Sequence, residues 1–192
     1  MSAPIIHING YPGTGKLTIA KALQEICRVR VLDNHSIYNV AFALLDFGTA
    51  EFKHTVEAVE KVALSTITFV PKSVPVVLTN ALFADSKWGL QRWEAVKKAG
   101  ATFDRPVGAV ILECDLVTNL ERLRTSDRDA RGKLTDSQDL YALRCRPLID
   151  SGIDVLLKVD VSKIAPAAAA TTIHSWMMAN WPEWATLQIA AP

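Results

Sequence analysis

Residues 10–18 read Gly-Tyr-Pro-Gly-Thr-Gly-Lys-Leu-Thr. They contain the spacing GxxxxGK, which is the core of a Walker A phosphate-binding loop. An apolar run, residues 4–9, precedes the loop. An amphipathic pattern follows it, with apolar side chains at helical spacing: Leu17, Ala20, Leu23 and Cys27. A glycine-rich turn without a ligand is the plainer interpretation, but the strand before and the helix after favour phosphate binding.

The residue types in this loop suit the binding of a nucleoside triphosphate. Gly10, Gly13 and Gly15 are expected to take positive φ, which lets the backbone approach phosphate oxygens closely. The exposed N–H groups and the helix N-terminus attract anions. Lys16 is expected to contact the β- and γ-phosphates and to act in catalysis. The predicted nucleotide-binding residues are Gly10, Tyr11, Pro12, Gly13, Thr14, Gly15, Lys16, Leu17 and Thr18.

One position departs from the usual motif. The serine or threonine that normally follows the lysine, and ligates Mg²⁺, is replaced by Leu17, which cannot ligate a metal. Thr18 lies one residue later. We therefore expect Thr18, or a water that it holds, to serve the β-phosphate and the metal.

The rest of the chain alternates between short apolar runs and helical patterns. The apolar runs, rich in Val, Ile and Leu without strict alternation, are typical of strands buried on both faces: residues 4–9, 29–33, 74–80, 107–114 and 155–161. Helices are expected between them, among them one over about 86–99 that ends at Gly100 and one over about 166–179. The pattern predicts a single α/β domain over 1–192, with a five-stranded parallel sheet between two helical layers.

The string PGTGKLT resembles the PGxGKGT loop of adenylate kinases and related small-molecule kinases, which also carry a non-hydroxyl residue and then threonine after the lysine. The layout is similar to that of shikimate, gluconate and chloramphenicol kinases. This resemblance implies a P-loop NTPase fold, a mobile lid and transfer of phosphate from ATP with Mg²⁺. The DGFPR-like string of adenylate kinases is absent after the third strand, where residues 79–83 read TNALF, and this argues against AMP as acceptor.

Polar residues follow several of the predicted strands, where ligands bind in open parallel sheets. Asp33 ends the second strand and is a candidate proton acceptor for a substrate hydroxyl. The alternative is that Asp33 or the next residue caps a helix. His35 and Asn80 are candidate acceptor-binding residues, and His7, inside the first strand, is expected to be packed and hydrogen-bonded. Asp115 could serve a metal, but a helix cap is the preferred interpretation.

Arginines are concentrated late in the chain. Residues 120–134 read LERLRTSDRDARGKL, and two more arginines follow at 144 and 146. Positive charge stabilises a phosphoryl group in transfer, and a closing lid excludes water. The spacing resembles lid segments of the kinases named above, so we expect a helical lid over about 122–136, with Arg128 and Arg131 as catalytic residues. The alternative is a solvated helix face with weak ion pairs.

Composition restricts the class of protein. The net charge is +1, with 21 Lys+Arg against 20 Asp+Glu, which argues against binding of long nucleic acids. Three scattered cysteines predict neither disulfides nor a zinc site. No run approaches the ~18 apolar residues of a membrane span, and no leader is evident, so we expect a cytoplasmic protein. The tail over 176–184 holds three tryptophans, which either pack on the domain or form a partner surface.

Other nucleotide-binding classes fit less well. The nearest match to the guanine-binding string NKxD is LKVD at 157–160, which we interpret as strand. An ATPase or regulator without a phosphate acceptor remains the main alternative, although the acidic string and helical domain of AAA-type ATPases are absent. A binding module that has lost its chemistry is a third possibility. The sequence favours a kinase acting on ATP and a small hydroxylated or nucleotide-like acceptor, whose identity and oligomeric partners it leaves open.

Overall fold

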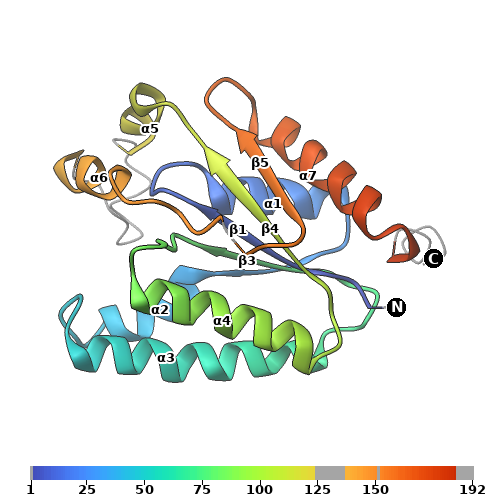
Figure 1. The fold of residues 1–192 in the computed structure, drawn as a ribbon, viewed down its shortest axis with the longest axis horizontal. Coiled ribbons are helices and arrows are strands. Elements are labelled where there is room, and N and C mark those ends of the chain that lie inside the picture. Colours follow the sequence, from blue (N-terminus) through green and yellow to red (C-terminus); the bar gives the residue numbers. More distant parts are fainter. Residues whose placement is uncertain (1, 124–136, 151, 185–192) are drawn as a thin grey trace.

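The computed structural model describes residues 2–123, 137–150 and 152–184. Five parallel strands alternate with helices along the chain (Figure 1). The strands are β1 Ile5–Gly10, β2 Arg30–Asp33, β3 Val76–Asn80, β4 Val107–Glu113 and β5 Leu156–Asp160. The helices are α1 Lys16–Ile26, α2 Asn34–Phe42, α3 Ala50–Ser65, α4 Lys87–Thr102, α5 Leu116–Leu123, α6 Ser137–Arg144 and α7 Pro166–Asn180, with a 3₁₀ turn, η1 Thr66–Phe69.

The strand order is β2-β3-β1-β4-β5, so β1 lies in the middle of the sheet. Helices α1 and α7 cover one face, and α3 and α4 cover the other (Figure 1). Side chains of β1 alternate between the two cores: Ile6 and Ile8 pack beneath α1 and α7, whereas Ile5 packs with Trp93 of α4. The predicted three-layer fold with a five-stranded parallel sheet is confirmed.

The element boundaries differ from the sequence expectations by one or two residues, with one informative error. Gly100 does not end its helix, because α4 continues to Thr102. A Cβ at this position would lie 2.2 Å from Cγ2 of Val107 and 3.0 Å from the carbonyl oxygen of Arg105. The glycine therefore permits close packing of α4 against the start of β4 rather than a left-handed helix cap.

The tryptophan-containing tail packs on the domain. Trp184 is fully buried and donates through Nε1 to the carbonyl of Ser73 at 2.9 Å. Trp181 lies over Gly108 of β4, where a Cβ would approach its ring to 2.6 Å. Among the described residues, no helix combines the length and apolar character needed to cross a bilayer.

Arg105 ties together the amino-terminal edge of the sheet. Its guanidinium is buried and donates to four carbonyls, those of Ala3, Val70, Pro71 and Val74, at 2.8–3.1 Å. Arg105→Met keeps the bulk of the side chain but leaves these acceptors unpaired. We expect the substitution to lower the free energy of unfolding by about 3 kcal/mol or more. Hydrogen bonds to charged groups are worth about 1.5–3 kcal/mol each, and their loss leaves buried carbonyls without a donor.

Urea denaturation measures this effect. Lys72→Met is the matched control, because the exposed Lys72 donates to a single backbone carbonyl, that of Phe103, and a change below about 0.5 kcal/mol is expected. A loss of less than about 1 kcal/mol in Arg105→Met would contradict the assigned role.

Candidate active site

The phosphate-binding loop connects β1 to α1 across residues 10–16. Gly13 and Gly15 have φ of 88° and 84°, as expected. The expectation for Gly10 is wrong: its φ is not positive. A Cβ on Gly10 would instead lie 2.8 Å from Oγ1 of Thr14 and 3.1 Å from the carbonyl of Leu112. Glycine is needed there because the loop passes close to β4.

Internal hydrogen bonds hold the loop in shape. The buried Thr14 donates through Oγ1 to the carbonyl of Tyr11 at 2.9 Å. Asn9, the last residue but one of β1, accepts from the N–H groups of Gly10 and Leu82 at 3.0 and 2.8 Å and donates to the carbonyl of Leu82 at 3.0 Å. Asn9 therefore fixes the loop to the segment between β3 and α4.

Lys16 is the first residue of α1. Its Nζ donates to the loop carbonyls of Gly10 and Tyr11 at 2.7 and 2.9 Å, so the ammonium lies within the loop. The first turn of α1 contains no acidic residue, which leaves the positive end of the helix dipole available to an anion. In the same turn Leu17 is half-buried and Thr18 is exposed.

Asp33 and Asn80 end neighbouring strands. Asp33 pairs with Thr79 across β2 and β3, and Asn80 pairs with Asn9 across β3 and β1. Asp33 occupies the N-cap position of α2 but makes no side-chain cap hydrogen bond, so the capping interpretation is wrong for this side chain. Its Oδ1 accepts from Oγ1 of Thr79 at 2.5 Å. The topology places Asp33, Asn80 and the phosphate-binding loop on one edge of the sheet.

Asn80 is the last residue of β3 and is buried, with 8% of its surface exposed. His35 lies half-buried in the first turn of α2, next to Asp33 in the chain. Asp115 accepts from the N–H and Oγ1 of Thr118 at 2.9 and 2.7 Å, which confirms it as the cap of α5. These hydrogen bonds hold the pKa of its carboxyl below the usual range.

His7 is packed, as expected, but one of its ring nitrogens lacks the hydrogen bond that was expected. The ring is 2% exposed and lies 5.4 Å from the ring of Trp93, and its Nε2 has no hydrogen-bond partner. Burial, and secondarily the charge of Lys16, lower the pKa of His7 to about 3. His7 is therefore a neutral core residue and carries no charge toward the loop.

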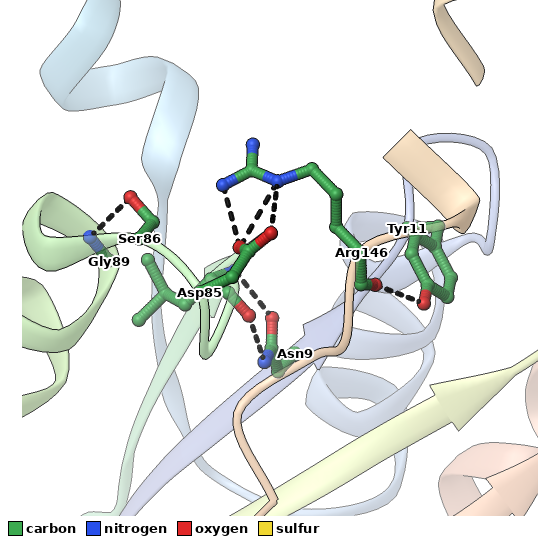
Figure 2. A network of polar contacts seen from close by, with 7 residues as sticks. Asn9, Tyr11, Asp85, Ser86, Gly89 and Arg146 are labelled. Carbon is green, nitrogen blue, oxygen red and sulfur yellow. Dashed lines mark hydrogen bonds and ion pairs between the residues drawn. The ribbon is translucent and has the colours of Figure 1, made fainter. Parts of the chain in front are cut away.

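Arg128 and Arg131, with most of the expected lid, lie outside the described residues. Two described arginines approach the loop, one from the last residue of α6 and one from the segment just after it. Arg144 lies over the ring of Tyr11, with its Cζ 5.1 Å from the ring centroid. Arg146 pairs with Asp85 through Nε and Nη2 at 2.8–3.1 Å, and its carbonyl accepts from the Tyr11 hydroxyl at 2.7 Å (Figure 2).

This segment joins the two sides of the site. The guanidinium of Arg146 holds the pKa of the Asp85 carboxyl below its usual range by hydrogen bonding and lies 4.5 Å from the centroid of the Phe83 ring. The N–H of Ala84 donates to the carbonyl of Pro147 at 2.8 Å. The two arginines were evident in the sequence. Asp85, and Asn119 of α5, which donates to the carbonyl of Pro12 in the loop, were not, because neither belongs to a recognisable motif.

The fold is shared with solved structures of kinases. No protein-family profile and no curated protein sequence matches the chain. A proposed kinase from Chloroflexus aurantiacus superposes with a TM-score of 0.67 at 18% identity, covering 91% of this chain and 98% of that one. The chain has the fold of the P-loop small-molecule kinases.

Two further structures have the same fold. A gluconokinase from Sinorhizobium meliloti has a TM-score of 0.63 at 14% identity, covering 96% of this chain and 97% of that one. The APS kinase CysC of Mycobacterium tuberculosis, in complex with AMPPNP and APS, has a TM-score of 0.58 at 16% identity, covering 92% of this chain and 98% of that one. Likeness at this level of identity establishes the fold alone.

Proposed function

We propose that the protein is a kinase that transfers the γ-phosphoryl group of ATP to a hydroxyl group of a small molecule. The observation that carries the proposal is that a phosphate-binding loop with an intact GxxxxGK core and the carboxylate of Asp33 lie on the same edge of the sheet, two strands apart. Strand β3 lies between these two strands and ends at Asn80. The bound AMPPNP in the APS kinase of the same fold supports ATP as the donor.

Each residue has a role in this proposal. The N–H groups of the loop and the N-terminus of α1 bind the β- and γ-phosphates. Lys16 exchanges the carbonyls of Gly10 and Tyr11 for phosphate oxygens. Asp33 accepts the proton of the acceptor hydroxyl as the hydroxyl oxygen attacks the γ-phosphorus and ADP leaves. His35 and Asn80 bind the acceptor, and Arg128 and Arg131 stabilise the charge on the phosphoryl group as it moves.

A magnesium ion fits this arrangement as a companion of the triphosphate. The described residues contain no group of three His, Cys, Asp or Glu side chains that could hold a metal by themselves. Mg²⁺ keeps several waters and is bound through substrate phosphates with one or two protein oxygens. Thr18, exposed in the first turn of α1, is the proposed protein ligand, directly or through water. The ion would neutralise charge on the β- and γ-phosphates.

An acceptor screen tests the function. ADP release is measured for the purified protein with ATP and Mg²⁺, alone and with neutral sugars, hydroxy acids such as gluconate and shikimate, and nucleosides. We expect one class of acceptor to raise the rate of ADP release at least about tenfold over the rate without acceptor, since a positioned base alone contributes 10²–10⁴-fold. Mass spectrometry should show a phosphorylated product. ADP release that no acceptor changes would favour an ATPase, and absence of ATP binding would overturn the proposal.

A further inference from the structure

Asn119 is a buried polar residue that belongs to no motif. It lies on α5, and none of its surface is exposed. Buried amides require hydrogen-bond partners, and Asn119 finds them on two separate segments. Its Nδ2 donates to the carbonyl of Pro12 in the phosphate-binding loop at 2.8 Å, and its Oδ1 accepts from Nη1 of Arg144 at 3.1 Å.

The loop is shaped to receive this amide. A Cβ on Gly13 would lie 2.3 Å from Nδ2 and 3.1 Å from the backbone carbonyl of Asn119. Gly13 therefore serves two purposes, since its φ of 88° also requires glycine. Because Asn119 is in contact with both Pro12 and Gly13, it supports the loop from the side of α5.

The second hydrogen bond of Asn119 fixes an arginine at the loop. Arg144 ends α6, and the amide oxygen of Asn119 and the ring of Tyr11 together determine where its guanidinium lies. A planar guanidinium held at two places is pre-organised, so less side-chain entropy is lost when it meets an anion. The amide of Asn119 thus orients both the loop and Arg144, which lies over the loop residue Tyr11.

We propose that Asn119 is a positioning residue for ATP, which holds the phosphate-binding loop through Pro12 and directs Arg144 toward the bound triphosphate. This inference rests on the proposed ATP-dependent function. Asn119 itself touches no substrate. It acts on ground-state binding through the loop, and on turnover through Arg144, whose charge matters most when the phosphoryl group moves.

Calorimetry with ATP and measurement of basal ATP turnover separate these two effects. Asn119→Ala removes both hydrogen bonds and should raise the Kd for ATP about tenfold, which corresponds to ~1.4 kcal/mol. Arg144→Gln should lower kcat about tenfold or more with less than a threefold change in Kd. In the double variant the two effects on kcat should not add, because Arg144 acts from the place that Asn119 gives it.

The controls distinguish positioning from packing. Asn180→Ala removes another side-chain amide, whose exposed Nδ2 donates to the carbonyl of Trp176 at 2.9 Å at the opposite edge of the sheet. It should change neither Kd nor kcat. Asn119→Asp, which keeps the shape and the acceptor for Arg144 but not the donor to Pro12, is the second variant if Asn119→Ala does not fold. It should weaken ATP binding and retain the dependence of kcat on Arg144.

Three outcomes decide the matter. Weaker ATP binding in a folded Asn119 variant, with non-additive kcat effects, supports the proposal. Unchanged Kd in folded Asn119 variants, with Lys16→Ala impaired, overturns it and leaves the kinase proposal intact. If neither the wild-type protein nor Lys16→Ala binds ATP, both the kinase proposal and the role of Asn119 fail.

Discussion

Replacing Lys16 with alanine should weaken ATP binding roughly 10- to 100-fold. Hydrogen bonds to charged groups are worth about 1.5–3 kcal/mol, and each 1.4 kcal/mol is a factor of ten in affinity. In the present structure Nζ donates to the carbonyl oxygens of Gly10 and Tyr11. A triphosphate offers the same ammonium far stronger acceptors, because phosphate oxygens carry negative charge.

Isothermal titration calorimetry of the variant with ATP checks this result. Lys21→Ala is the matched control, since Lys21 lies on the exposed side of the same helix and should not change the Kd. Thermal melting without ligand establishes that both variants fold. An ATP affinity in Lys16→Ala equal to that of the wild type would show that the loop does not bind phosphate.

The fold was predictable because its signals are local. Each buried strand is a short apolar run, and the order of strands and helices along the chain suffices to predict a parallel sheet. The boundary at Gly100 was not predictable, because the sequence does not reveal that Val107 would occupy the space of a side chain there. A glycine near a helix end has the same appearance whether it caps the helix or allows another element to approach.

The candidate site was predictable only where one motif contains it. The loop over 10–18 carries its own pattern, but the partner of Asp33 is Thr79, 46 residues away. The residues that brace the loop are similarly distant: Asn119 lies 107 residues from Pro12, and Arg146 lies 135 residues from Tyr11. Such contacts follow from tertiary packing, and a single sequence contains no periodic pattern that would indicate them.

Some of these distant contacts connect the loop to the segment between β3 and α4. Tyr11 is a loop residue whose ring lies under Arg144 and whose hydroxyl donates to the backbone of Arg146. Arg146 then reaches Asp85, between β3 and α4. A continuous chain of contacts therefore connects the loop to the segment that follows Asn80.

Asp33→Asn should lower the kcat of phosphate transfer roughly 10²–10⁴-fold, while the Kd for ATP stays within about threefold of the wild-type value. The variant keeps the shape of the side chain but cannot accept a proton at neutral pH. Its Oδ1 can still accept from the hydroxyl of Thr79, which is the hydrogen bond that the carboxylate makes now. The free energy of unfolding should therefore change by less than about 1 kcal/mol.

The competing role for Asp33 is structural, as the partner of Thr79, and two further variants separate the roles. Thr79→Val removes the hydroxyl but leaves the carboxylate, so it should retain most of the transfer rate if Asp33 is the base. Asp46→Asn, at an exposed position between α2 and α3, should change nothing. The acceptor identified by the screen is used for all three, with ATP affinity and melting temperature measured in parallel. A folded Asp33→Asn protein that transfers phosphate at the wild-type rate would refute the base, whereas equal losses in Asp33→Asn and Thr79→Val would make the hydrogen bond, rather than the proton transfer, the functional feature.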